Sequence, residues 1–443
     1  MNRLLLNLRV STTFLAATIV HKENEKNEKI HRNLDGYPNS IFATAIANSS
    51  KMIRRRMEEC GAPGMVVAVS INGRTVWSQG FGYSDVENDV ECHPGTVMRV
   101  ASISKCFTSV AMAKLWEEGK LDVDKPIHDY LPDYPPMKYK GKEVRVTLKH
   151  LLCHVGGVRH YNKEDVPDDK SKKENESEIY STKHYTTVTE GLELFKDDPL
   201  INHPDENKFG YSSHAWTLVS AVLEKASGKT FLRLMNDTFH SLGMKHTKPD
   251  LNNPIIYGRS RYYERKDGRL FNSPYVDLSY KWSGGGFLST VGDLLKFADA
   301  VMYCYNVKNT NYLPGFLRKD TVEKLWSSFS VPQRSEMSSD PEYMRYGLGW
   351  YVCPGQEGRG NCPNHQLEVA HTGGSVGASS IILLLPDAKI DLPNSCPPSS
   401  ADYKSDGVRS DAPMQGMSVA IITNIGKANL TPLARNISQQ FLR

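Results

Sequence analysis

Strand-like segments stand at both ends of the 443-residue chain, and this arrangement limits the folds available to it. Near the N-terminus, residues 64–73 and 75–82 are joined at Asn72-Gly73, a dipeptide typical of two-residue β-hairpins. Near the C-terminus, three further segments run apolar or alternate: residues 367–372, 378–385 and 417–423. The region between, about 120–345, carries mainly helical signals and loops. We therefore predict an α+β (α/β) fold, with an antiparallel sheet from both chain ends, flanking helices and an inserted, mainly helical region.

The sequence Ser102-Ile-Ser-Lys105 lies where a helix is expected to begin. Apolar residues then repeat at helical spacing up to a stop at Gly119: Phe107, Val110, Ala111 and Leu115. Lys105 is therefore expected one turn after Ser102 on the same face. Because a serine hydroxyl needs a base to become a nucleophile, we interpret Ser102 as the nucleophile and Lys105 as its base or proton shuttle. The structural alternative is a helix-capping serine beside a solvated lysine.

Two further motifs follow in chain order. Tyr211-Ser-Ser213 precedes an apolar, helix-like run, and His371-Thr-Gly-Gly374 lies between two strand-like segments. The order Ser-x-x-Lys, Tyr-x-polar, His-Thr-Gly resembles the penicillin-binding-protein-like serine hydrolases, in the branch around class C β-lactamases and D-alanyl-D-alanine carboxypeptidases. Within this branch the chain looks most like the serine β-lactamase-like proteins of animal mitochondria. The resemblance runs from about Lys51 to the end, with two interruptions.

This resemblance implies a β-lactamase/transpeptidase-like fold and a set of site residues. Ser102, Lys105 and Tyr211 would be catalytic, and substrate would be bound by Ser213, His371, Thr372, Gly373 and Gly374. The backbone N–H groups of Ser102 and Gly374 would form the oxyanion hole. Two positions depart from the family's usual residues. Ser213 replaces an asparagine, and His371 replaces a lysine that anchors a substrate carboxylate, so we expect altered recognition and less β-lactam hydrolysis.

The expected function is that of a serine hydrolase forming an acyl-enzyme at Ser102 and cleaving peptide or other amide bonds. The resemblance further implies a mitochondrial serine peptidase of the intermembrane space, assembly into homo-oligomers or filaments, and a link to mitochondrial lipid metabolism. Two alternatives remain. One is an esterase or β-lactamase on the same fold, and the other is a filament or scaffold protein whose hydrolase site is vestigial.

Bulk properties argue against several other functions. A net charge of +4 and a pI near 8.4 are too mild to indicate nucleic-acid binding. No apolar run reaches the roughly 20 residues that a transmembrane helix needs. The eight cysteines form no C-x-x-C pair, and the cluster His150, His154 and His160 lacks an accompanying carboxylate or cysteine pattern. We therefore expect no metal ion and no cofactor.

The chain is expected to divide into a targeting segment with a linker (residues 1–43) and a catalytic domain (residues 44–443). The first 22 residues contain Arg3 and Arg9 but no acidic residue, which is typical of a mitochondrial presequence; a secretory signal is the alternative. Two polar stretches, about 161–185 and 389–415, resemble insertions. Each is expected to be a solvated loop or, alternatively, a subunit contact or substrate gate.

Overall fold

The computed structural model describes residues 41–161, 178–307, 315–327, 329–330, 344–355, 366–390, 392 and 414–442. It divides into two units, Met1–Ala47 and Asn48–Arg443. The first unit is described only from residue 41, and it contains the first turn of helix α2 (Ala43–Cys60). The architecture below is that of the second unit.

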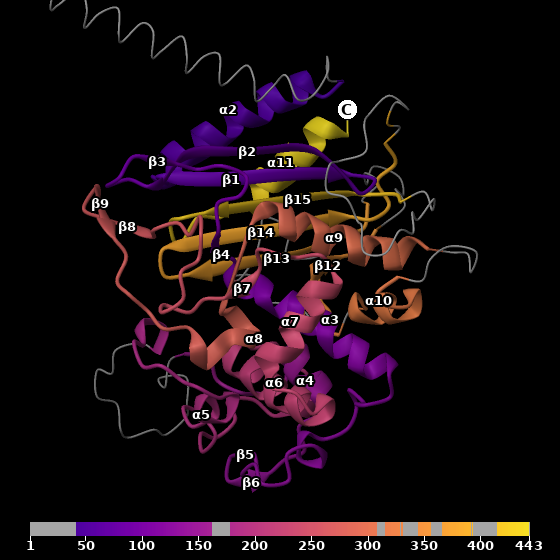
Figure 1. Ribbon diagram of the computed structural model, residues 1–443. Helices are drawn as coiled ribbons and strands as arrows, with labels where there is room; N and C mark the ends of the chain where they lie inside the picture. Colours follow the sequence, from indigo (N-terminus) through magenta and orange to yellow (C-terminus); the bar gives the residue numbers. More distant parts are fainter. Residues whose placement is uncertain are drawn as a thin grey trace, which may run out of the picture. The chain divides into compact units, whose positions relative to one another are not determined.

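An eight-stranded antiparallel sheet brings the two ends of this unit together (Figure 1). Its strand order is β11-β12-β13-β14-β15-β1-β2-β3, so the early strand β1 pairs with the late strand β15. The strands are β1 (Gly64–Ile71), β2 (Arg74–Asp85), β3 (Val90–Glu91), β11 (Arg345–Tyr346), β12 (Tyr351–Cys353), β13 (Glu368–Ser375), β14 (Ala378–Leu385) and β15 (Met417–Thr423). The predicted sheet from both chain ends is confirmed. The hairpin is confirmed as well, since Asn72 and Gly73 have φ angles of 52° and 74° and join β1 to β2.

The sheet is covered on both faces, which explains why β1, β14 and β15 are buried along their whole length. Ser70 of β1 and its partner Ser418 of β15 both donate hydrogen bonds to Asp299 of α9 (Val291–Asn306). The neighbouring residue Val69 points the other way and pairs with Trp77, whose ring stacks on Phe441 of α11 (Thr431–Phe441). Helices α9 and α11 therefore cover opposite faces.

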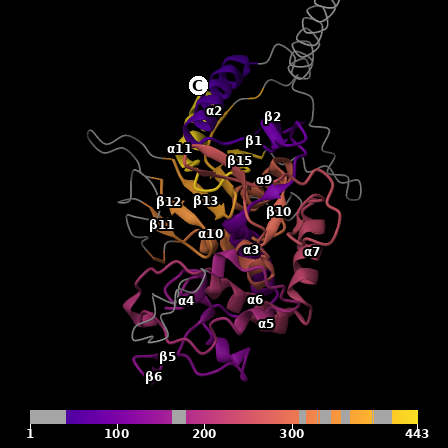
Figure 2. The same cartoon turned by 90° about the vertical axis from the view of Figure 1, so that its left-hand side faces the viewer.

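The inserted region lies beside the sheet and contains most of the remaining helices (Figure 2). The α-helices are α3 (Ser104–Glu117), α4 (Leu148–Leu152), α5 (Val188–Leu192), α6 (Ser213–Ser227), α7 (Phe231–Ser241), α8 (Trp282–Gly285) and α10 (Lys319–Leu325). The 3₁₀ helices are η1 (Ala101–Ile103), η2 (Ile127–Asp129), η4 (Glu178–Tyr180), η5 (Pro204–Glu206) and η6 (Ser279–Lys281). Short strands form three small sheets: β4 (Met98–Arg99) with β10 (Phe287–Ser289) and β7 (Lys248–Pro249), β5 (Lys138–Tyr139) with β6 (Lys142–Glu143), and β8 (Tyr263–Lys266) with β9 (Arg269–Asn272).

Helix α3 lies between the sheet and the inserted helices, and nearly all its residues are buried. Phe107 packs edge-on against Phe239, Phe287 and Phe297, which belong to three other elements. A helix that is buried on all sides packs against other elements all around. These contacts fix the position of α3 and of its ends. The N-terminal end of α3 is the part that carries the Ser-x-x-Lys motif.

The two expected insertions lie mostly outside the described residues, which omit 162–177, 391 and 393–413. The final part of the first one, from Glu178 to Tyr185, is described; Tyr180 and residues 182–184 are exposed, whereas its last residue packs against the fold. Tyr185 is buried, and its backbone N–H donates to Ser279 Oγ at 2.7 Å. No helix in the described ranges is both long and apolar enough to cross a membrane.

Candidate active site

The turn before Ser102 is held in an unusual backbone conformation. Ala101 has a φ of +46°, a left-handed conformation that costs a non-glycine residue about 1 kcal/mol. Its carbonyl oxygen accepts a hydrogen bond from Ser104 Oγ at 2.6 Å, and Ser104 Oγ in turn accepts one from the N–H of Phe287 in β10. Ser102 lies in the short helix η1, two residues before α3 begins at Ser104. Because of this turn, Ser102 is partly exposed although the following helix is buried.

The Ser102 hydroxyl contacts two of the predicted catalytic side chains. Tyr211 Oη donates a hydrogen bond to Ser102 Oγ at 2.7 Å, and Lys105 Nζ lies 3.2 Å from the same atom. Lys105 Nζ also lies 4.7 Å from the centre of the Tyr211 ring. The structure therefore brings Ser102, Lys105 and Tyr211 together, although Tyr211 lies 109 positions away in sequence.

Lys105 is completely buried. Its Nζ lies 2.6 Å from the carbonyl oxygen of Gly284 and 3.1 Å from Ser213 Oγ, in addition to Ser102. Burial, followed by the charge of Lys281, lowers the pKa of Lys105 well below its usual value. A neutral amine has two N–H groups and one lone pair, and Gly284 can only accept. If Ser213 accepts the second N–H, the lone pair is left for the Ser102 hydroxyl, which is the arrangement a general base requires.

The carbonyl group that contacts Lys105 comes from helix α8, to which Gly284 belongs. This helix packs so closely against α6 that a Cβ at Gly284 would lie 3.1 Å from the backbone oxygen of Ser213. The close approach is what allows the Gly284 carbonyl to reach Lys105.

Two histidines hold the backbone of the tyrosine motif in place. His154 Nδ1 accepts the N–H of Ser212 at 3.1 Å, and His160 Nδ1 accepts the N–H of Ser213 at 3.2 Å. Ser212 then caps α6, because its Oγ accepts the N–H of Ala215. Burial raises the pKa of Tyr211 well above its usual value, so its hydroxyl stays protonated at neutral pH. Sequence reasoning noted both histidines but assigned neither of them this supporting role.

Strand β13 forms a wall beside the nucleophile. A Cβ at Gly373 would collide with Val100 O, two residues before Ser102, and with Ser380 Oγ. Ser380 Oγ donates to Val100 O at 2.8 Å and so fixes this approach. Gly374 is exposed, and a Cβ there would meet no atom within 4 Å. The Thr372–Gly374 segment therefore lies next to Ser102, with Gly374 facing open space.

His371 is a buried, neutral residue. Its Nδ1 lies 2.7 Å from the carbonyl oxygen of Thr372 and must carry the ring proton, so Nε2 accepts the hydroxyl of Tyr346 at 3.0 Å. Burial, followed by the charge of Lys105, lowers the pKa of His371 to about 3. His371, which stands where the family usually has an anchoring lysine, is therefore uncharged at neutral pH, and both of its ring nitrogens already have partners.

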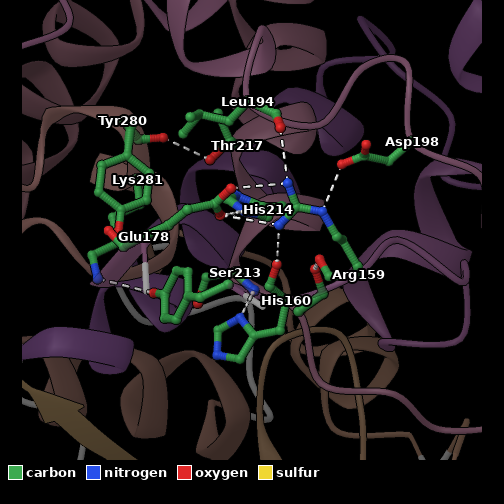
Figure 3. Close-up of polar contacts among 12 residues, drawn as sticks. Arg159, His160, Glu178, Leu194, Asp198, Ser213, His214, Thr217, Tyr280 and Lys281 are labelled. Carbon is green, nitrogen blue, oxygen red and sulfur yellow. Dashed lines mark hydrogen bonds and ion pairs between the residues drawn. The ribbon is translucent and has the colours of Figure 1, made fainter. Parts of the chain in front are cut away.

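A charged network lies behind the tyrosine motif (Figure 3). The buried guanidinium of Arg159 contacts Glu178 at 2.9 Å and Asp198 at 2.6 Å, and Glu178 also contacts His214 at 2.6 Å. Nothing in the sequence pattern indicated this network, because its members are separated by up to 55 residues and meet only in the folded chain. In the described part of the chain, no group of three His, Cys, Asp or Glu side chains could hold a metal ion.

Known proteins share both the sequence and the architecture. The family model described as Beta-lactamase matches residues 50–439. The human serine β-lactamase-like protein LACTB, mitochondrial, is 39% identical over 90% of this chain and 80% of its own length. Two solved structures are similar in fold. EstCE1, a hydrolase with promiscuous acyltransferase activity, has a TM-score of 0.67 at 17% identity, covering 91% of this chain and 100% of its own. The octameric penicillin-binding protein homologue from Pyrococcus abyssi has a TM-score of 0.64 at 22% identity, covering 88% and 75%.

Proposed function

The chain belongs to the β-lactamase family, and on this premise we propose that it is a serine hydrolase that cleaves peptide or other amide bonds through an acyl-enzyme at Ser102. One observation carries the proposal: Ser102 Oγ accepts from Tyr211 at 2.7 Å while a buried lysine amine lies 3.2 Å away. A serine between a proton donor and an amine whose pKa is lowered by burial is arranged for nucleophilic catalysis.

The reaction would proceed in two balanced halves. Lys105 accepts the Ser102 proton while Ser102 Oγ attacks the substrate carbonyl, and the backbone N–H groups of Ser102 and Gly374 bind the oxyanion. The C–N bond then breaks as Tyr211 donates its proton to the leaving amine, and Lys105 returns the proton to Tyr211. Water, deprotonated along the same route, attacks the ester carbonyl. The carboxylic acid leaves, and Ser102 regains its proton.

The neutral His371 favours substrates without a carboxylate at that position. In the resembled motif a lysine supplies a fixed positive charge there, whereas burial lowers the pKa of His371 to about 3. Penicillins carry a carboxylate and would gain no charge pairing from this residue. We therefore favour neutral peptide segments over β-lactams. An esterase that accepts neutral acyl esters is the second candidate supported by the same observation.

The finer biological assignments are part of the proposal. A mitochondrial location is supported by the similarity to the human mitochondrial protein and by the composition of the first 22 residues, and the intermembrane space rests on the resemblance alone. Assembly into homo-oligomers or filaments is supported by the octameric state named for one structural neighbour. A link to mitochondrial lipid metabolism rests on the resemblance alone. The contrasting proposal, a scaffold with a vestigial site, is disfavoured by the intact hydrogen bonds around Ser102.

The test is the intact mass of the protein after exposure to a fluorophosphonate, a neutral activated peptide ester and a penicillin. We expect one covalent adduct per chain from the first two reagents, little from penicillin, and none on Ser102→Ala. Sedimentation of wild type and Ser102→Ala, which should assemble alike, separates assembly from catalysis. If folded wild type formed no adduct with any reagent, the hydrolase proposal would be wrong and the scaffold would replace it.

A further inference from the structure

A second lysine, Lys281, is buried close to the candidate site. It ends the 3₁₀ helix η6, and only 2% of its surface is exposed. Its side chain runs beside the turn that precedes Ser102: a Cβ at Gly285 would lie 3.8 Å from Lys281 Cδ and 3.9 Å from the Ala101 carbonyl carbon. Within the described ranges, neither Lys281 nor Lys105 forms an ion pair with a carboxylate. An unpaired buried lysine is costly, so a structural role alone explains it poorly.

Two hydroxyl groups connect Lys281 to Lys105. Lys281 Nζ donates to Tyr161 Oη at 3.0 Å, and Ser213 Oγ lies 3.1 Å from Lys105 Nζ. Tyr161 and Ser213 are close enough for the Ser213 hydroxyl to act on the phenol and oppose the rise of its pKa on burial. Figure 3 shows Lys281 and Ser213 within one cluster of polar contacts. If Ser213 donates its proton to Tyr161, Ser213 Oγ must accept from Lys105. The lone pair of Lys105 is then directed to Ser102.

Protonation of Lys281 and protonation of Lys105 oppose each other. Burial, followed by the charge of Arg99, lowers the pKa of Lys281 to about 7, whereas the pKa of Lys105 is lowered well below its usual value with Lys281 as the second cause. Two ammonium ions without a counter-ion repel each other strongly in a buried site. Lys281 Nζ lies 4.4 Å from the centre of the Tyr161 ring and 5.1 Å from that of Tyr280, and such ring faces favour a charged amine, so the positive charge of the pair is better accommodated on Lys281.

We propose that Lys281 is a positioning residue that carries the positive charge of this lysine pair and, through Tyr161 and Ser213, keeps Lys105 neutral and directed toward Ser102. The proposal deepens the hydrolase function proposed above and rests on it. It also gives a role to serine at position 213, whose hydroxyl can accept from Lys105 while donating to Tyr161.

Other titratable groups around the pair do not supply the missing counter-ion. Those that face Lys105 or Lys281 are Arg99, Cys106, His154, His160, Tyr161, Tyr211, His214, Tyr280 and His371. Burial lowers the pKa of His154, His160, His214 and His371, which leaves them neutral at pH 7. The carboxylate near Tyr161, Glu178, is already paired with Arg159 and His214.

The test compares the rate of Ser102 phosphonylation from pH 5 to pH 9 in wild type, Lys281→Met, Lys281→Arg and Tyr161→Phe. Loss of the Lys281 charge should make Lys105 easier to protonate. In Lys281→Met the acid limb of the pH–rate profile should therefore move to higher pH by roughly one unit, which is about a tenfold loss of rate at pH 6. The rate at the alkaline plateau should be unchanged. Lys281→Arg keeps the charge and should keep the limb near its wild-type position. Tyr161→Phe should lower the plateau, because the hydrogen-bonded path is broken.

Tyr280→Phe is the matched control, because it keeps the ring that lies 5.1 Å from Lys281 Nζ and removes only the hydroxyl, which donates to the Glu178 backbone oxygen. It should lower thermal stability without moving the acid limb. If Lys281→Met lowered the phosphonylation rate equally at every pH and did not shift the acid limb, Lys281 would have only a structural role and the proposal would be wrong.

A second measurement is independent of any reaction at Ser102. In the Ser102→Ala protein, ¹³C NMR of labelled lysine Cε atoms follows the titration of both amines, assigned with Lys105→Arg and Lys281→Arg. Adding Lys281→Met should raise the titration midpoint of Lys105. An unchanged midpoint would refute the proposal that the charge of Lys281 keeps Lys105 neutral. This holds even if the wild type forms no adduct, an outcome that would refute the hydrolase function by itself.

Discussion

At the scale of single residues, His371 should not discriminate between charged and neutral substrates. Burial lowers its pKa to about 3, and its nitrogens are engaged by Thr372 O and the Tyr346 hydroxyl. A histidine whose pKa is far below 5 gains no charge as the pH falls from 8 to 5. It follows that substrate selection by a carboxylate should be independent of pH in this interval.

The corresponding measurement uses an activated peptide ester with a free carboxylate and the matched compound with that carboxylate methylated. We expect the ratio of their acylation rates to stay constant between pH 5 and pH 8, although each rate changes with Lys105. A ratio that rises about tenfold in favour of the carboxylate toward pH 5 would mean that His371 becomes charged and binds the carboxylate.

At the scale of elements, the position of β13 against the turn before Ser102 depends on Gly373. A methyl group there would collide with Val100 O and Ser380 Oγ, and both belong to backbone or short side chains that cannot move aside. Gly374, the next residue, has no atom within 4 Å of its would-be Cβ. The two glycines are therefore a matched pair, one required by packing and the other placed beside open space.

We expect Gly373→Ala to destabilise the fold by about 1–3 kcal/mol and to suppress acylation of Ser102, because the strand must shift away from the nucleophile. Gly374→Ala should unfold at the wild-type temperature and lose activity only through substrate binding. Thermal unfolding and phosphonylation rates of the two variants distinguish these effects. Equal stability of the two variants would contradict the close contact between β13 and Val100.

The sequence predicted those elements whose own residues determine them. The strands β1, β2, β13, β14 and β15 were predicted because they are apolar runs bounded by turn residues. The pair Ser102 and Lys105 was predicted because its spacing has a chemical reason, whereas the role of Tyr211 came from the family resemblance. Lys281 and Tyr161 were not found, because their role arises from contacts between elements distant in sequence. The left-handed φ of Ala101 was equally invisible, since alanine is not a residue that favours it. The residues that the sequence pattern did not predict are therefore mainly those that surround and position the catalytic side chains.

At the scale of the whole second unit, one carboxyl group of helix α9 contacts strands from both ends of the unit. Asp299 of α9 accepts Ser70 Oγ of β1 at 2.7 Å and Ser418 Oγ of β15 at 3.0 Å. These two strands come from opposite ends of the unit and pair directly at this point. Burial raises the pKa of Asp299 to about 7, against 3.8 for an ordinary aspartate, so the folded state binds this proton more tightly than the unfolded state.

The sign of the pH dependence follows from this difference. A carboxyl whose pKa is raised on folding contributes stability that is fully present below pH 3.8 and is lost as the pH rises through about 7. The free energy of unfolding should therefore fall by up to about 1.4 kcal/mol per pH unit over this interval from Asp299 alone, less if water reaches the carboxyl. Asp299→Asn keeps the shape without the charge. Denaturant unfolding at pH 4, 5.5, 7 and 8.5 should give the free energy of unfolding of each protein. The value for the variant minus that for wild type should rise up to pH 7 and stay constant above it. A difference that did not change with pH would mean that Asp299 is ionised in the folded chain, and that the two strands and α9 are joined by a charged and not a neutral carboxyl group.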